Sequence, residues 1–190
     1  MEKIDTITAA AGCAPFEADK TIVLVGLMGV GKTTVGRRLA KRLGIGFVDA
    51  DTEIEKAAGC RIPDIFECFG EAAFRDGERR VIGRLLEGKP HVLATGGGAF
   101  MNEETRARIK DHAISVWLKA DVDTLVERTS RREDRPLLKN GDPAEILGRL
   151  AAERNPFYAE ADLTVESNDG PHDDVVEAII KALQAHRDRG

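Results

Sequence analysis

The chain has 190 residues and a mass of 20.7 kDa, which suits one ordinary domain with a substantial core. It carries 28 basic and 33 acidic residues, for a net charge of −5. Binding to a phosphate backbone needs a basic face, so this balance argues against nucleic acid as the main partner. The three cysteines, Cys13, Cys60 and Cys68, are too few for a disulfide framework and lack metal-binding spacing.

The N-terminal segment has one early lysine, several acidic residues and only a weak apolar stretch, so it is a poor secretory signal. The sequence contains no apolar run of the length that a bilayer requires. These features predict a cytoplasmic protein with no membrane partner. We expect residues 1–19 to form a flexible extension and residues 20–187 to form a single domain.

Short apolar runs rich in β-branched residues predict five strands. The runs are Thr21–Val25, Gly46–Asp49, His91–Thr95, Ala113–Leu118 and Ala161–Val165. Helical spacing follows the first run from Lys32 to Gly44, and Asp121 is placed to cap a helix after the fourth run. Strands that alternate with helices predict a three-layer α/β fold, with a five-stranded parallel sheet covered on both faces.

Two stretches interrupt this alternation. Residues 50–90 have room for more helix than a single crossover needs, and residues 130–141 are charged and contain Pro136 and Gly141. We interpret the first as a helical substrate-binding insertion and the second as a mobile lid.

The strongest motif is G-x-x-x-x-G-K-T, which runs from Gly26 to Thr33 directly after the first predicted strand. Its glycines allow the backbone amides to surround a phosphate, and the following helix directs its positive end at the same anion. Lys32 can reach the β- and γ-phosphates, and the Thr33 hydroxyl can bind Mg²⁺. The predicted ATP contacts in this loop are Gly29, Val30, Gly31, Lys32, Thr33 and Thr34.

The rest of the chain narrows the class of P-loop protein. The guanine-binding N-K-x-D and the D-x-x-G of switch GTPases do not occur in the sequence. A motor ATPase usually ends its third core strand in an acidic residue, whereas here that strand runs into Thr95 and three glycines. A small-molecule kinase therefore remains.

Two aspartates follow the second predicted strand. Asp49, beside the phosphate loop, is placed to hold Mg²⁺ through water together with Thr33. Asp51 can accept hydrogen bonds from substrate hydroxyls and orient or deprotonate the attacking one. Such a pair is ordinarily a helix cap with a surface acid, and Asp51 is a candidate cap for a helix over 51–58. Its position directly after a strand favours the functional interpretation.

Candidate acceptor contacts lie further along the chain. Arg75 and Glu78 share one face of a predicted helix, which fits either an exposed ion pair or a guanidinium held ready for a carboxylate. Gly96–Gly98 end a core strand, where the absence of side chains lets a substrate approach the backbone. Arginines crowd the lid region, and a lid arginine can neutralise charge on a transferred phosphoryl group.

Taken in order, these residues resemble the shikimate kinase family from about residue 21 to about residue 185. The matching segments are Gly26–Thr34, Asp49-Ala-Asp51, Phe74-Arg75 with Glu78, Gly96–Ala99, Arg135–Leu138 and Arg154-x-x-x-Tyr158. The resemblance implies a nucleoside-monophosphate-kinase type of fold. It also implies a monomer that uses ATP and Mg²⁺ to phosphorylate the 3-hydroxyl of shikimate in chorismate and aromatic amino-acid synthesis.

The resemblance also assigns roles to single residues. It implies that Lys32, Asp51 and Arg135 are catalytic and that Arg128, Arg135 and Pro171 contact ATP. It further implies that Asp51, Arg75, Gly97 and Arg154 bind the acceptor and that Thr33 and Asp49 bind the metal. The stretch from Val165 to Pro171 is about one residue shorter than the family's usual adenine loop.

Two rival functions stay open at this point. One is a kinase of another small acceptor, such as gluconate or a nucleoside monophosphate. Paired arginines beside an acidic group favour a compact hydroxy acid, whereas a base-binding insertion should be richer in aromatic residues. The other rival is a nucleotide-binding regulatory module without catalysis. The presence of Lys32, Thr33, Asp49 and Arg135 argues against it.

Overall fold

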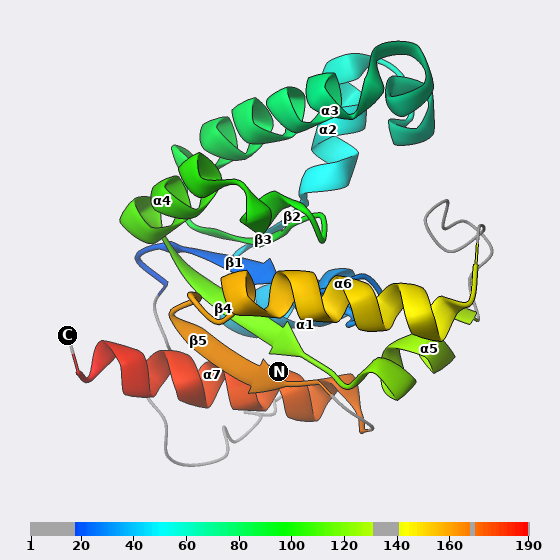
Figure 1. The fold of residues 1–190 in the computed structure, drawn as a ribbon. Helices are drawn as coiled ribbons and strands as arrows, with labels where there is room; N and C mark the ends of the chain where they lie inside the picture. Colours follow the sequence, from blue (N-terminus) through cyan, green and yellow to red (C-terminus); the bar gives the residue numbers. More distant parts are fainter. Residues whose placement is uncertain (1–17, 131–140, 168–169, 190) are drawn as a thin grey trace, which may run out of the picture.

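A computed structural model describes residues 18–130, 141–167 and 170–189 (Figure 1). Within these ranges the chain forms one parallel sheet of five strands in the order β2-β3-β1-β4-β5. The strands are β1 Thr21–Val25, β2 Gly46–Asp49, β3 His91–Ala94, β4 Ala113–Lys119 and β5 Leu163–Glu166. The predicted five-stranded parallel sheet is confirmed.

Helices cover both faces of this sheet (Figure 1). They are α1 Lys32–Leu43, α2 Ala50–Ala58, α3 Ile62–Leu86, α4 Glu103–His112, α5 Val122–Ser130, α6 Pro143–Tyr158 and α7 His172–Arg187, with a short 3-10 turn η1 at Ala99–Met101. Helices α1 and α7 lie side by side, joined by ion pairs from Arg38 to Asp173 and from Arg42 to Glu177. Helix α4 packs against β4, and α6 packs against α5 and η1. The described helices include none that is long and apolar enough to span a membrane.

Strand β1 is the centre of the fold because its side chains are apolar and buried on both faces. Ile22, Val23, Leu24 and Val25 are fully buried between β3 and β4. In the register of the sheet, Leu24 of β1 and Asp49 of β2 are both level with Ala94 of β3. The loops that follow these three strands therefore leave the same edge of the sheet, where ligands bind in open α/β folds.

Helices α2 and α3 stand away from the sheet beyond β2 (Figure 1). They have a small apolar cluster of their own, formed by Ile54, Ile65, Phe74 and Val81. Helix α3 is kinked at Gly70, whose φ of 80° lies in the left-handed region that glycine tolerates. This pair of helices occupies the stretch that we interpret as the substrate-binding insertion.

Two local predictions need correction, and one is confirmed. Asp49, not Asp51, caps α2: its carboxylate accepts a hydrogen bond from the Asp51 amide at 3.1 Å. Strand β3 ends at Ala94, one residue before the predicted end, and the Thr95 hydroxyl and amide both donate to the Leu24 carbonyl, at 3.0 and 3.3 Å. Asp121 caps the start of α5 as predicted, accepting from the Thr124 amide at 2.7 Å. Residues 1–17 of the predicted extension and residues 131–140 of the predicted lid, which include Arg135, lie outside the described residues.

Candidate active site

The phosphate loop leaves β1 at Gly26 and enters α1 at Lys32. Gly26, Gly29 and Gly31 have φ values of 137°, 85° and 96°, which other residues rarely adopt. Helix α1 has no side-chain cap at its start, so its first amides stay available to an anion. The Lys32 ammonium donates to the carbonyls of Gly26 and Leu27 at 2.7 and 2.8 Å, which holds it within the turn.

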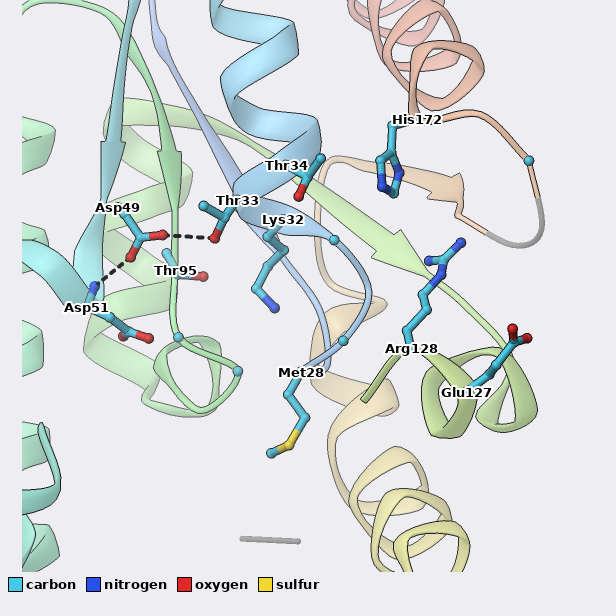
Figure 2. Close-up of a pocket in the computed structure, with 15 residues that line it drawn as sticks. Met28, Lys32, Thr33, Thr34, Asp49, Asp51, Thr95, Glu127, Arg128 and His172 are labelled. Atoms are coloured by element: carbon cyan, nitrogen blue, oxygen red, sulfur yellow. Dashed lines mark hydrogen bonds between the residues drawn. The ribbon is translucent and has the colours of Figure 1, made fainter. Parts of the chain in front are cut away.

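A cavity of about 510 Å³ opens beside this loop (Figure 2). The predicted site residues on its wall are Gly29, Gly31, Lys32, Thr33, Thr34, Asp49, Asp51, Gly97 and Arg128. Gly96, predicted as part of a glycine wall for the substrate, also lines it. Sequence reasoning did not single out Met28, Glu127, Gly170 and His172, which line it too, and gave Thr95 no role in the site. Two predicted ATP contacts do not line the cavity: Val30, a loop residue whose side chain is buried, and Pro171, which follows the lining residue Gly170 in the chain. Arg75 and Arg154 lie just beyond the cavity, next to the glycine turn.

Three polar residues form a chain along one side of the cavity (Figure 2). The Thr33 hydroxyl donates to one oxygen of Asp49 at 2.9 Å, and the other oxygen accepts from the Asp51 amide at 3.1 Å. The hydroxyl and carboxylate thus present hard oxygen atoms at one point, next to the phosphate loop. This is the type of donor that Mg²⁺ prefers.

The turn after β3, Gly96–Gly98, lies between the phosphate loop and the side chains of α2, α3 and α6 that approach it. A Cβ on Gly96 would lie 3.0 Å from both the Asp51 and the Glu78 carboxylates. On Gly97 it would lie 3.4 Å from an Arg154 nitrogen and 3.5 Å from the Met28 amide. On Gly98 it would lie 2.5 Å from an Arg75 nitrogen. The three glycines therefore let two carboxylates and two guanidinium groups converge beside the phosphate loop, in a space that side chains would fill.

Arg75 is held in place by acidic residues of its own helix. It donates to the buried Glu78 carboxylate at 2.8 Å and to the exposed Glu71 at 3.3 Å. Burial disfavours the charge on Arg75, but these two partners raise its pKa overall. The functional interpretation of the Arg75–Glu78 pair is therefore favoured over a solvated surface pair, since the Glu78 side chain is only 4% exposed.

Burial disfavours the charged form of Glu78, and the ion pair with Arg75 offsets this effect only in part. Burial raises its pKa, while Arg75 acts in the opposite direction. One of its oxygens, Oε1, is buried without a hydrogen-bond partner in the described part of the chain. The folded protein therefore binds a proton at Glu78 more tightly than the unfolded chain does. The stabilisation associated with that proton is complete below the unfolded pKa and is lost as the pH rises through the folded value.

Glu78→Gln is accordingly expected to change how stability depends on pH. The melting temperature of the variant should gain on that of the wild type as the pH rises from roughly 4 towards neutrality, because the neutral amide does not have to lose a proton. Thermal unfolding at a series of pH values measures this. Glu71→Gln, which removes the exposed partner of the same arginine, is the control and should give a curve parallel to the wild type. Parallel curves for both variants would contradict the prediction.

Tyr158 fixes the middle of the glycine turn. It is fully buried, its hydroxyl donates to the Gly97 carbonyl, and its ring lies against Phe100 and Trp117. Burial raises the pKa of Tyr158 to about 12, so the hydroxyl stays protonated and remains a donor. Helix α6 carries both Tyr158 and Arg154, and the tyrosine thus ties this helix to the turn that Arg154 approaches.

Arg128 joins the other end of the cavity to the phosphate loop. It donates to the Ser167 carbonyl at 2.8 Å, and the Ser167 hydroxyl donates to the Val30 carbonyl at 3.0 Å. The chain after β5 is therefore attached to the phosphate loop on the side away from Asp51 (Figure 2).

The family model for shikimate kinase matches residues 28–184 of this chain. The chain belongs to the shikimate kinase family. It is 63% identical over 167 residues to the shikimate kinase of Bradyrhizobium diazoefficiens, covering 88% of this chain and 81% of that protein. It is also 63% identical over 174 residues to the shikimate kinase of Caulobacter vibrioides, covering 91% and 86%.

Solved structures agree with this membership. The shikimate kinase of Acinetobacter baumannii, in complex with shikimate, matches with a TM-score of 0.85 and 43% identity, over 90% of this chain and 96% of that one. A gluconokinase from Sinorhizobium meliloti matches with a TM-score of 0.64 at 18% identity, a likeness that shows the fold alone. The gluconate-kinase alternative therefore gains support only at the level of architecture, whereas the shikimate kinase family is shown by sequence.

Proposed function

We propose that this protein transfers the γ-phosphoryl group of ATP to the 3-hydroxyl of shikimate, giving shikimate 3-phosphate and ADP. The observation that carries the proposal is the convergence at Gly96–Gly98, where Asp51, Arg75 and Arg154 approach the wall of the phosphate-loop cavity. Two guanidinium groups suit the carboxylate of a small hydroxy acid, and a neighbouring aspartate suits its hydroxyls. Membership of the shikimate kinase family selects shikimate among such acids.

The chain's own residues supply positioning and charge to the reaction. The amides of the phosphate loop and Lys32 hold the phosphates, and Asp51 orients the attacking hydroxyl and accepts its proton. The Thr33 hydroxyl and the Asp49 carboxylate, 2.9 Å apart, fit a magnesium ion that arrives with ATP. When bound, that ion would offset the negative charge of the phosphates. Catalysis of this kind depends on positioning and electrostatic stabilisation.

A coupled assay of ADP production tests the proposed function. ADP should form when ATP, magnesium and shikimate are all present, and only slowly when shikimate is omitted. Gluconate and a nucleoside monophosphate are the comparison acceptors, chosen because they represent the rival kinases. Turnover with one of these acceptors and not with shikimate would reject the proposed substrate. Binding of ADP without turnover on any acceptor would favour the regulatory module.

Arg75→Lys is expected to weaken shikimate binding while leaving ATP binding intact. Lysine keeps the positive charge but loses the planar fork that can bind a carboxylate through two hydrogen bonds. The loss of a charge-assisted hydrogen bond corresponds to roughly a 10- to 100-fold rise in KM for shikimate. Steady-state kinetics with each substrate varied in turn measure it.

The matched control for this variant is Arg80→Lys. Arg80 lies on the same helix and forms an ion pair with Asp76 at 2.8 Å, but its side chain is 72% exposed. KM for shikimate should be unchanged in the control. An equal rise in both variants would show a general effect on α3 and would contradict a specific role for Arg75.

The organisation of the chain follows the same proposal. Residues 20–187 would be one kinase domain in which the insertion at 50–90 holds the acceptor. The lid at 130–141 would bring Arg135 to the phosphates, and Arg128 and Pro171 would contact adenine. We also propose a cytoplasmic monomer, as the composition and the family resemblance indicate. Light scattering coupled to size-exclusion chromatography measures the mass in solution, with 20.7 kDa expected for the monomer.

A further inference from the structure

Tyr158 is a buried residue to which the proposed reaction assigns no role. Its hydroxyl donates to the carbonyl of Gly97, and Gly97 lines the cavity. Burial raises the pKa of Tyr158 to about 12, and the charge of Arg154 and its hydrogen bond to the phenol act in the opposite direction. One oxygen atom thus donates to the glycine turn and accepts from Arg154.

The ring that carries this hydroxyl is fixed by packing. It is fully buried, and its centroid lies 6.4 Å from that of Phe100 and 6.0 Å from that of Trp117. Phe100 belongs to η1 and Trp117 belongs to β4, so the ring is held by elements other than its own helix. Side chains in a close-packed interior keep to one rotamer. The phenol oxygen is therefore a fixed point at the end of α6.

Helix α6 by itself holds Arg154 less firmly than a regular helix would. Pro156 lies inside the helix, between Arg154 and Tyr158. A proline at such a position has no amide proton for the hydrogen bond to the residue four positions earlier, and its ring crowds the carbonyl of that residue. Arg154 and Tyr158 are four residues apart and share one face of the helix, so the phenol can hold the guanidinium where the helix is weakened.

The place of this guanidinium matters because it faces the glycine turn. A Cβ on Gly97 would lie 3.4 Å from an Arg154 nitrogen. The hydroxyl of Tyr158 therefore sets both the backbone of the turn and the positive charge beside it. A side chain that is already oriented loses less conformational freedom when a ligand binds, which favours affinity.

We propose that Tyr158 is a positioning residue for the phosphoryl acceptor, with a hydroxyl that holds the Arg154 guanidinium and the Gly97 carbonyl ready to receive it. Because its side chain is fully buried, Tyr158 acts through these two groups and not by touching the substrate. This inference rests on the proposed function, because it takes Arg154 and the glycine turn to hold shikimate. The phosphate loop is not part of this bridge, so ATP binding should not depend on it.

Tyr158→Phe tests this proposal, since it removes one oxygen atom and keeps the buried ring. We expect Kd and KM for shikimate to rise about five- to tenfold, as the loss of one hydrogen bond implies. KM for ATP, and kcat when both substrates are saturating, should stay within about twofold of the wild type. Isothermal titration with shikimate and steady-state kinetics with each substrate varied in turn measure these changes.

Arg106→Gln is the matched control for a loosened α6. Arg106 donates to the carbonyls of Phe100 and Met101, both at 2.9 Å. Its guanidinium also lies over the ring of Phe157 on α6, 4.9 Å from the centroid. The control should therefore lower the melting temperature but leave Kd for shikimate within about twofold of the wild type. A rise in Kd as large as that in Tyr158→Phe would overturn the inference, because packing of α6 alone would then explain both.

A double variant tests whether the hydroxyl acts through Arg154. Arg154→Met keeps a long side chain but cannot donate to the phenol or to a carboxylate. In this background, the further change Tyr158→Phe should raise KM for shikimate by no more than about twofold, because residues that act as a unit are not additive. The full five- to tenfold rise in this background would overturn the inference.

A spectroscopic measurement keeps the test decisive if Tyr158→Phe does not fold. Tyr158 is the only tyrosine of the chain, so tyrosine labelled with ¹³C at Cζ gives one NMR signal. This signal should shift in Arg154→Met, which removes the hydrogen bond to the phenol, and should stay in place in Arg106→Gln. An unchanged signal in a folded Arg154→Met variant would contradict the bridge.

The outcomes separate this inference from the proposed function. If the wild type neither binds shikimate nor forms ADP in its presence, the proposed function and the inference both fail. If the wild type binds shikimate and Tyr158→Phe binds it equally well, the inference alone is overturned. A fall in kcat with unchanged KM for shikimate would also overturn it, because the hydroxyl would then serve the transfer step and not the placement of the acceptor.

Discussion

Lys32→Met is expected to lower kcat by roughly 10²- to 10³-fold, the range seen when one preorganised donor to a transition state is removed. Methionine keeps much of the length and apolar character of the lysine stem but has no positive charge to offset the charge on the transferred group. In the structure the ammonium is held by the carbonyls of Gly26 and Leu27, within the turn that should receive the phosphates. Single-turnover measurement of ADP formation isolates the chemical step.

The control for this substitution is Lys41→Met. Lys41 lies in the last turn of the same helix, on its exposed side, and loses the same unit of charge. Its kcat should stay within about twofold of the wild type. Circular dichroism and thermal unfolding show whether Lys32→Met remains folded. A folded Lys32→Met variant with near-normal kcat would contradict the role of the phosphate loop in catalysis.

Asp51→Asn is the second substitution with a large expected effect. The amide keeps the shape of the side chain and can still hydrogen-bond to a hydroxyl, but it does not accept a proton. If Asp51 removes the proton from the attacking hydroxyl, kcat should fall by roughly 10²- to 10⁴-fold. KM for shikimate should change much less, because most contacts with the acceptor remain.

Glu53→Gln is the matched control, since it removes a carboxylate two residues further along α2. Glu53 forms an ion pair with Lys56 at 2.8 Å and does not line the cavity. Its kcat should match that of the wild type. A near-normal kcat for Asp51→Asn would rule out proton abstraction and leave Asp51 as an orienting acceptor. A fall in kcat for the control as large as for Asp51→Asn would point to a disturbance of α2.

Local sequence patterns were enough to predict the phosphate loop and the pairing of Arg75 with Glu78. The phosphate loop is a contiguous motif between a buried strand and a helix, so its sequence determines both its conformation and its chemistry. The pairing of Arg75 with Glu78 follows from helical spacing alone. The sheet was predictable because its strands are short apolar runs separated by helices.

Other features of the site depend on contacts between segments that are distant in the sequence. The spacing of residues 75 and 78 predicts their pairing but not the burial of Glu78 against Gly96, which comes from the way α3 packs beside the turn after β3. His172 reaches the phosphate loop only because α7 packs along α1. The sequence also did not determine which residue caps α2. Both Asp49 and Asp51 are plausible caps by residue type, and the structure places Asp49 at the cap position.

The separate apolar cluster of α2 and α3 has a consequence for local stability. Ile54, Ile65, Phe74 and Val81 pack mainly with one another, whereas Ile82 and Leu86 at the far end of α3 belong to the main core. Helix α2 and the first part of α3 are thus a small cooperative unit that can open while the sheet stays intact. Its amide protons should exchange with solvent sooner than those of β1, and Arg75 and Glu78 lie at the boundary between the two units.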